Sequence, residues 1–269
     1  MNNVANDMKI LVLMGSNRCN GNTDQLTGLM KDHLQQEAEQ HQIALEIETI
    51  YLGKQNLQFC QGCRACYDQG EDHCPLKDDL LAIKAKLLAA DGIILASPVY
   101  VDDVSGITKN FIDRLCHVCH RPQFAGKSAY LLATSGGSRT GKALETMQMA
   151  LRTWGFYIVG QSGHKMGALM KREDTRAQFD AQAARAAKQL FTAIHRGSYR
   201  RPDFFSLMMF KIQQTAWQTE GDRGTLDYRY WEQQGWLDSG RTFFIPHEAN
   251  ALKVALARMT GVVIGRLMA

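Results

Sequence analysis

Short apolar runs alternate with amphipathic segments along residues 1–196. Each apolar run ends near a glycine or a turn residue, which is typical of a strand buried on both faces of a sheet. The segments between the runs are more polar and carry apolar residues at helical spacing. The predicted strands cover residues 9–15, 43–52, 92–100, 128–137 and 156–163, and the predicted helices cover residues 23–40, 78–90, 107–119, 140–154 and 175–195.

Strands that alternate with helices in this way predict a doubly wound α/β fold, with a five-stranded parallel sheet covered by helices on both faces. Ligands of such sheets bind beyond the carboxyl ends of the strands, near the point where the strand order reverses. The loops at residues 15–23, 53–77, 97–106 and 134–141 follow predicted strands and are unusual in composition. We therefore expect the functional site in these loops.

The alternation ends at "GSYRRP", residues 197–202. We expect a first domain at residues 1–197, with a cysteine-rich insertion at residues 58–76, and a C-terminal extension at residues 198–269. Aromatic residues crowd together in the extension, and such density is typical of interfaces and of lids over planar ligands. A small appendage packed on the first domain is the simplest alternative. The aromatic residues are Trp217, Tyr228, Tyr230, Trp231, Trp236, Phe243 and Phe244.

The last stretch of the chain, residues 250–269, is amphipathic and carries Lys253, Arg258 and Arg266. Its length is too short to span a membrane. We expect it to dock on the same subunit or on a neighbouring subunit of a homo-oligomer. Contact with a membrane surface is the alternative.

Composition narrows the class of protein. The chain has 269 residues, of which 45% are hydrophobic and 22% are charged, as in an ordinary globular protein. A net charge of +4 is too small to indicate a nucleic-acid partner. The first residues do not read as a secretory signal, and no apolar run is long enough to span a membrane. The expected location is the cytoplasm.

The loop "GSNRCNGNT", residues 15–23, has the composition of a phosphate site. Its glycines permit close backbone approach, and its hydroxyl and amide side chains supply hydrogen bonds. Arg18 supplies a fork-shaped cation, and the helix that begins near Thr23 directs free N–H groups toward the loop. A plain capped helix start is the alternative, with Asn22 as N-cap and Gln25 as its partner. Two glycines and an arginine exceed what a cap requires, so we expect an anion here.

Four cysteines lie within "CQGCRACYDQGEDHCP", residues 60–75. In a reducing compartment such a group is more typical of metal binding than of disulfides. The CxxCxxC spacing, with a later Cys before Pro, is typical of iron–sulfur ferredoxins. Zinc sites more often use two separated CxxC pairs. A [4Fe–4S] cluster is therefore expected, and zinc or free thiols remain alternatives.

A second cysteine motif, "CHVCH" at residues 116–120, matches the attachment pattern of covalent haem. Such attachment requires export, for which the sequence gives no signal. The motif also continues the apolar stripe of the helix predicted at residues 107–119. We therefore expect Cys119 to be a core residue.

The phosphate loop, together with "SPVYVDDVSGITKNFIDRL" at residues 97–115, resembles the NADPH-dependent FMN reductase branch of the flavodoxin-like proteins. The four cysteines narrow this resemblance to the iron–sulfur flavoproteins. The likeness covers about residues 8–196 and rests on three motifs in the expected order. It implies a flavodoxin-like fold and bound FMN.

The resemblance also implies which residues hold the cofactors. The FMN phosphate would be held in the first loop, and the ring would lie along "SPVY" and "TSGG". Asp24 departs from the family pattern and would have to point away from the phosphate. The implied FMN contacts are Ser16, Arg18, Asn22, Thr23, Pro98, Val99, Tyr100, Val101, Thr134, Ser135, Gly136 and Gly137, and the implied cluster ligands are Cys60, Cys63, Cys66 and Cys74.

The expected activity is that of an FMN-dependent oxidoreductase that passes electrons between a [4Fe–4S] cluster or NAD(P)H and an acceptor. Ferredoxin or NAD(P)H would be the donor, and a quinone-like molecule or a protein would be the acceptor. One alternative is an NAD(P)H-dependent FMN or quinone reductase without a cluster. Another, from a different class, is a flavodoxin-like electron carrier without substrate turnover. No side chain is assigned as a catalytic acid, base or nucleophile.

Overall fold

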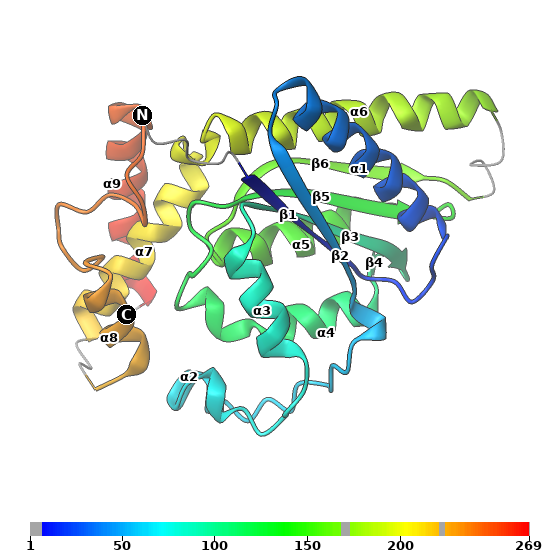
Figure 1. The fold of residues 1–269 in the computed structure, drawn as a ribbon. Coiled ribbons are helices and arrows are strands. Elements are labelled where there is room, and N and C mark those ends of the chain that lie inside the picture. The colour runs from blue at the N-terminus through cyan, green and yellow to red at the C-terminus, as the bar shows by residue number, and fades with distance from the viewer. Residues whose placement is uncertain (1–6, 168–172, 221–223, 269) are drawn as a thin grey trace.

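The computed structural model describes residues 7–167, 173–220 and 224–268. Residues 1–6, at the start of the first predicted domain, lie outside the described residues. The described chain forms a central sheet with helices on both sides and a helical C-terminal extension at one end (Figure 1). No helix within the described ranges is long and apolar enough to cross a membrane.

The sheet confirms the predicted five parallel strands. Its order is β2-β1-β3-β5-β6, in which β1 pairs with both β2 and β3. This crossover places the carboxyl ends of β1 and β3 side by side, as expected of a doubly wound fold. The strands are β1 (Asp7–Met14), β2 (Ala44–Tyr51), β3 (Gly92–Tyr100), β5 (Ser128–Ser135) and β6 (Tyr157–Lys165).

A sixth strand, β4 (Asp103–Val104), was not predicted. It pairs antiparallel with the end of β3 through a tight hairpin. Val101 and Asp102 form the turn with φ values of 51° and 64°, which the twist of a two-residue hairpin requires of both central residues. A strand of two residues has no periodicity to reveal it.

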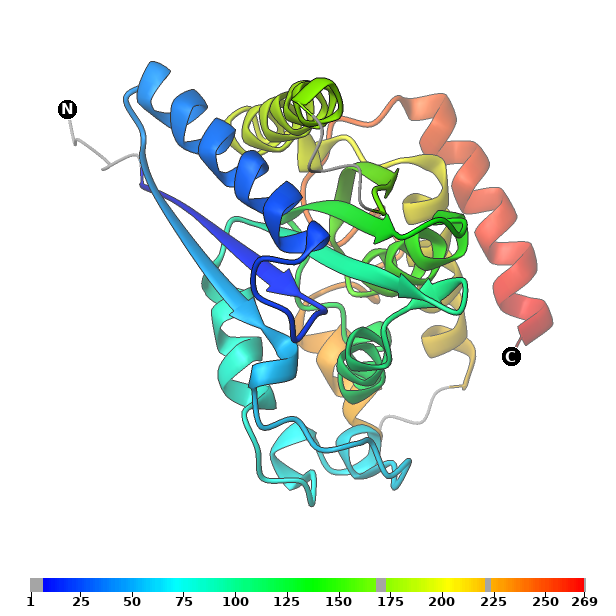
Figure 2. The same ribbon diagram turned by 90° about the vertical axis from the view of Figure 1, so that its right-hand side faces the viewer.

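Five helices cover the two faces of the sheet (Figure 2). One face packs against α1 (Asn22–Gln40) and α6 (Glu173–His195), and the other against α3 (Leu80–Ala89), α4 (Gly106–Arg114) and α5 (Gly141–Thr153). Each face has its own apolar core, because the strands between them are buried on both sides. All five of these helices were predicted from the sequence.

One of the predicted helix ends is wrong. The helix expected to run to residue 119 ends at Arg114, and the 3-10 helix η3 (Cys116–Cys119) follows. The backbone tightens there, since the N–H of Leu115 bonds the carbonyl of Ile112 three residues earlier at 3.2 Å. The "CHVCH" motif therefore lies on a separate short element. Its Cys119 is half-buried against the apolar core, as expected.

The segment between β2 and α3, which contains the cysteine-rich insertion, has only short elements. These are the 3-10 helix η1 (Leu52–Lys54), the four-residue helix α2 (Ala65–Asp68) and the 3-10 helix η2 (Glu71–His73). In Figure 1 the insertion lies below the sheet, beyond the ends of α3 and α4. It has little regular structure of its own, so its shape depends on contacts with its neighbours.

The extension contains the 3-10 helix η5 (Ser198–Arg200), α7 (Phe204–Glu220), α8 (Leu226–Gln233) and α9 (Ala251–Met268). It has a third apolar core, to which four of the seven predicted aromatic residues contribute buried side chains. Helices α7 and α9 approach closely, since a Cβ atom on Gly261 would lie 2.9 Å from the carbonyl oxygen of Met208. The extension is thus a packed unit with its own core.

Candidate functional site

The phosphate loop leaves β1 at Gly15 and is fixed against β3 and α4. A Cβ atom at Gly15 would lie 1.8 Å from Oγ1 of Thr108, so only glycine fits there. The hydroxyl of Ser105 donates to the carbonyl of Gly15 at 2.6 Å, and its oxygen also caps α4 by accepting from the N–H of Thr108. Ser97 completes the network through the N–H of Ser105 at 3.1 Å. The phosphate loop at residues 15–23 and the segment at residues 97–115 are therefore held together by one set of buried hydroxyls.

The first turn of α1 offers unused N–H groups to the loop. Gly21 is the N-cap residue, and no side chain within the described ranges caps the helix. The expected alternative, in which Asn22 caps the helix, is wrong, because the amide of Asn22 donates to the carbonyl of Gly167 at 2.8 Å. Gln25 instead donates to the carbonyl of Asn20. Free N–H groups and the positive end of the helix dipole together favour a bound anion.

A cavity lies in front of this helix end, between the loops that follow β1, β3 and β5. Its empty volume is about 1070 Å³, with the opening to solvent included. Ten of the twelve predicted FMN contacts line it, namely Ser16, Arg18, Asn22, Thr23, Pro98, Val99, Tyr100, Thr134, Ser135 and Gly136. Val101 and Gly137 are not among the lining residues, whereas Gly21 and Gly167 are. The side chain of Val101 is fully exposed on the β3–β4 turn.

The carboxylate of Asp24 is turned toward other partners. It accepts hydrogen bonds from the N–H of Asn20 at 2.7 Å and from the hydroxyl of Tyr51 at 2.7 Å. The hydrogen bond to Asp24, aided by partial burial, raises the pKa of Tyr51 to about 12. Asp24 does not line the cavity. A negative charge in the first helical turn is therefore compatible with an anion in front of the helix.

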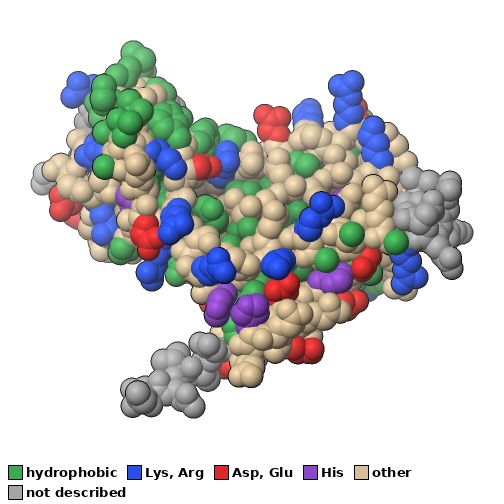
Figure 3. All heavy atoms as spheres, turned by 90° about the horizontal axis from the view of Figure 1, so that it is seen from above, with side chains coloured by type: hydrophobic (Ala, Val, Ile, Leu, Met, Phe, Trp, Pro, Cys, Tyr) green, Lys and Arg blue, Asp and Glu red, His purple; other side chains and the backbone are tan. Residues whose placement is uncertain are grey.

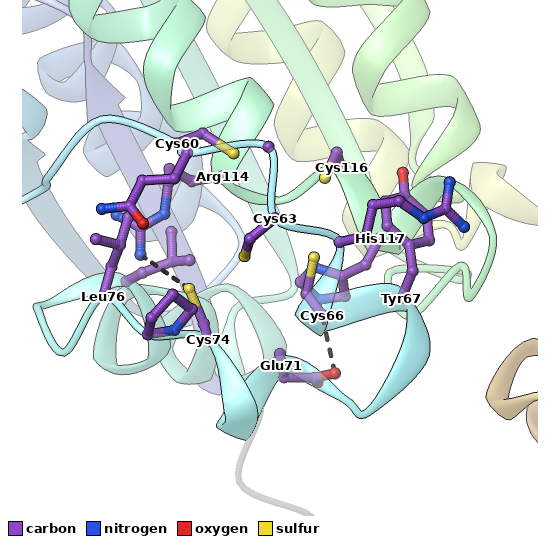
Figure 4. A pocket seen from close by; sticks show the side chains of 15 residues that line it. Cys60, Cys63, Cys66, Tyr67, Glu71, Cys74, Leu76, Arg114, Cys116 and His117 are labelled. Carbon is purple, nitrogen blue, oxygen red and sulfur yellow. Dashed lines mark hydrogen bonds and ion pairs between the residues drawn. The ribbon is translucent and has the colours of Figure 1, made fainter.

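A second cavity lies in the cysteine-rich insertion. Cys60, Cys63, Cys66 and Cys74 all line it, and so does Cys116 from η3 (Figure 4). Its empty volume is about 570 Å³, with the opening included. The interaction between the thiols of Cys66 and Cys116 raises the pKa of Cys66 and lowers the pKa of Cys116 to about 6. Cys116 was not predicted to be here.

Arg114 joins the insertion to the last turn of α4. Its guanidinium is buried and donates to both carboxylate oxygens of Asp78, at 2.5 and 3.1 Å, and to the carbonyl of Gln58 at 2.7 Å. Burial opposes ionisation of Asp78, but the hydrogen bonds from Arg114 outweigh it and lower the pKa of Asp78. Nη2 of Arg114 also lies 3.9 Å from the sulfur of Cys74. The same cation thus orders the insertion and faces one of its thiols.

A buried ionic group lies beneath the cavity. Lys84 donates to Glu71 at 2.5 Å, and the imidazole of His117 lies beside this pair, with Nε2 3.3 Å from Nζ of Lys84 and 3.7 Å from Oε2 of Glu71. Burial raises the pKa of Glu71, but the Lys84 contact outweighs this and brings it to about 2. Burial and Lys84 lower the pKa of His117 to about 4, so it is neutral at pH 7. Nδ1 of His117 has no partner among the described residues.

The C-terminal extension also supports the insertion. Asp227 of α8 forms a buried ion pair with Arg121, which in turn donates to the carbonyls of Cys66, at 2.5 Å, and Tyr67, at 3.5 Å. Asp227 also bonds His120 at 2.7 Å. The short helix that carries Cys66 is therefore held by a residue far along the chain. This function of the extension was not evident from the sequence.

The donor set of the second cavity is suited to an iron–sulfur cluster. Thiolates are the usual ligands of such clusters, and nearby cations offset the negative charge of a thiolate-bound cluster. No group of three or more His, Cys, Asp or Glu side chains within the described residues is gathered closely enough to hold a single metal ion.

Comparison with known proteins gives the same assignment of family. Residues 8–167 match the family model of NADPH-dependent FMN reductase. An iron-sulfur flavoprotein of Archaeoglobus fulgidus is 26% identical over 231 residues, which are 86% of this chain and all of that protein. An iron-sulfur flavoprotein of Methanosarcina thermophila is 33% identical over 162 residues, covering 58% of this chain and 80% of that protein.

The fold is also found among solved structures. An oxidoreductase of Corynebacterium diphtheriae aligns with a TM-score of 0.54 and 20% identity, over 70% of this chain and 98% of that chain. The family model, the two flavoprotein relatives and the ordered motifs around the first cavity agree. The chain therefore belongs to the NADPH-dependent FMN reductase family and is an FMN-dependent oxidoreductase.

Proposed function

We propose that this oxidoreductase passes electrons between FMN in the first cavity and a [4Fe–4S] cluster held by Cys60, Cys63, Cys66 and Cys74 in the second. The observation that carries the proposal is that these four thiols, separated in the sequence by loops and a short helix, line one cavity. FMN, when bound, exchanges a hydride or single electrons and so connects a two-electron donor to a one-electron cluster.

The chain's own residues would bind and orient FMN rather than react. The N–H groups of the first turn of α1, with Arg18 and the hydroxyls of Ser16 and Thr23, would hold its phosphate. The loops at 98–100 and 134–136 would flank the ring. Because the flanking backbone is fixed by the hydroxyls of Ser97 and Ser105, these loops are preorganised.

Helix α4 connects the two proposed sites. Its N-cap, Ser105, bonds the phosphate loop, and its last residue, Arg114, faces Cys74. Nine residues separate these two, which at the rise of an α-helix is roughly 14 Å. The proposed cofactors would thus lie at the two ends of one short helix, a separation compatible with electron transfer inside one chain.

The electron donor is NAD(P)H in the family to which the chain belongs. We propose NAD(P)H or a ferredoxin-like protein as donor and a quinone-like molecule or a protein as acceptor. A reductase of FMN or quinones without a cluster is the second candidate, and the absence of closely gathered metal ligands within the described residues favours it. A carrier without turnover would cycle only with protein partners.

We also propose that the protein is a homo-oligomer that pairs through α9. Figure 3 shows apolar side chains gathered over the end of the molecule where α9 lies. The exposed large apolar residues of α9 follow one another at intervals of four, three, four and four, the spacing of a helix-to-helix seam. An antiparallel second copy of α9 would match this stripe residue for residue. The stripe consists of Leu252, Leu256, Met259, Val263 and Leu267.

Light scattering on the Leu256→Glu/Val263→Glu variant tests this pairing. We expect its mass to fall to that of one chain, while a Lys253→Glu control at the edge of the stripe keeps the wild-type mass. A wild-type protein that is monomeric and binds anionic lipid vesicles would instead support the membrane-surface alternative.

The proposed electron path is tested on protein purified without oxygen. We expect about four iron, four sulfide and one FMN per chain, and bleaching of the flavin by NADPH. FMN without iron, but with rapid bleaching, would support the reductase that lacks a cluster. Zinc at one per chain would support the zinc alternative.

A further inference from the structure

The second cavity contains one thiol more than a four-iron cluster needs. Four thiols belong to the insertion, and the fifth, that of Cys116, comes from η3 at the end of α4. In Figure 4 the sulfur atoms of Cys63, Cys66 and Cys116 point toward the same space. Cys66 and Cys116 thus line one cavity from two different elements. The remaining cysteines, Cys19 and Cys119, do not line this cavity.

The position of Cys116 is fixed from both sides along the chain. On one side Arg114 is tied to Asp78 and Gln58, and on the other Arg121 is tied to Asp227. Next to Cys116, the buried His117 also lines the cavity, and its Nδ1 has no partner within the described residues. A buried polar atom without a partner is costly, so it indicates that a further group belongs in this cavity.

Cys66 is held less directly than Cys116. It lies on the four-residue helix α2, whose backbone is attached to Arg121 through two carbonyl groups. Arg121 is in turn held by Asp227 from the extension. Cys116 follows directly from α4, which is part of the main core. The two neighbouring thiols therefore depend on different parts of the molecule.

We propose that Cys116 is an alternative ligand of the cluster that can take the coordination position of Cys66. This inference rests on the proposed cluster. In the exchange the iron–sulfur bond to Cys66 breaks and one to Cys116 forms; the Cys116 thiol gives up its proton, and the released Cys66 thiolate takes one up. No electron is transferred, and the cluster keeps four thiolates. The cluster then has a ligand on η3 in place of the ligand on α2.

Alanine variants prepared without oxygen as full-length protein with FMN test the exchange, because alanine removes the ligand atom. We expect Cys66→Ala and Cys116→Ala each to keep nearly the wild-type iron and sulfide content, and the double variant to retain less than about a tenth. The reduced single variants should differ from each other in their electron paramagnetic resonance spectra, since their fourth ligands differ. Cys119→Ala, which removes a half-buried thiol outside the cavity, is the matched control.

The outcomes separate this inference from the proposed function. A wild-type protein without iron would overturn the cluster and this inference with it. A wild-type protein with iron, in which Cys66→Ala alone loses as much as the double variant, would overturn the exchange and leave the cluster intact. A double variant that keeps its iron would also overturn the exchange. FMN content, measured on every variant, shows that the chain is folded.

Discussion

The two cavities are built in different ways. The first lies at the carboxyl ends of adjacent parallel strands, and its loops are fixed by backbone geometry and by short hydrogen bonds among buried hydroxyls. The second lies in an insertion with little regular structure, held by the ion pair of Glu71 with Lys84 and by hydrogen bonds from the buried Arg114 and Arg121 to its backbone carbonyls. The geometry of the first site therefore follows from the strand order and the loops of the fold, whereas the geometry of the second site depends on a few specific long-range contacts.

This contrast has an energetic basis. Hydrogen bonds among neutral hydroxyls contribute about 1 kcal/mol each and are numerous around the first cavity. A buried ion pair contributes little net stability, but removal of one partner costs about 3–5 kcal/mol because it leaves an uncompensated charge. Single substitutions should therefore damage the second site more selectively than the first.

The largest effect is expected from Cys63→Ala. Cys63 has no alternative thiol assigned to it, so the variant should lose nearly all iron and sulfide. FMN should stay bound, because Cys63 is not among the residues that line the first cavity. Metal analysis and the flavin spectrum of protein prepared without oxygen check both statements. Unchanged iron content would show that Cys63 is not a ligand.

The Arg18→Ala/Thr23→Ala variant is expected to lose FMN affinity and to keep its iron. Hydrogen bonds to a charged group contribute about 1.5–3 kcal/mol each, so the loss of two should raise the Kd of FMN by roughly 1,000-fold. The iron content should not change. Fluorescence titration with FMN measures the affinity. Wild-type affinity in this variant would mean that the phosphate is bound elsewhere.

An intermediate effect is expected from Asp227→Ala, which leaves the buried Arg121 with only the more distant carboxylate of Glu71, 3.8 Å away. The cost should be about 3 kcal/mol and should fall on the insertion, because Arg121 holds the backbone of Cys66 and Tyr67. We expect faster loss of iron during dialysis and a lower melting temperature, with FMN affinity unchanged. Asp32→Ala, at an exposed position on α1, is the control. Equal iron loss in both variants would contradict the supporting role of the extension.

Most residues that line the first cavity were singled out in the sequence, whereas Cys116 and the residues that support the second cavity were not. Strand ends and phosphate loops are local features, visible in short apolar runs and in the residues that follow them. Cys116 lines the second cavity, and Asp227 supports its wall through Arg121. Both residues lie far along the chain from the cysteine-rich insertion, so no pattern in the local sequence predicts these contacts. The motif "CHVCH" was interpreted as the continuation of a predicted helix, and the position of Cys116 became clear only because α4 ends early at Arg114.

The smallest effect is expected from Glu71→Gln and appears as a change in pH dependence. The folded pKa of Glu71 is about 2, below its ordinary value of 4.5. Its ionised form therefore stabilises the fold fully above about pH 4.5, and this contribution is lost as the pH falls toward 2. The variant should lose less stability than wild type across that interval. Glu46→Gln, at an exposed pair with Lys9, should behave as wild type.

The most direct test of the central claim is a reductive titration of the protein without oxygen. One FMN takes up two electrons and one [4Fe–4S] cluster takes up one, so we expect about three electron equivalents per chain. The Cys63→Ala variant should take up about two. Uptake of only two equivalents by the wild-type protein, with no paramagnetic signal from a reduced cluster, would contradict the claim that one chain carries both.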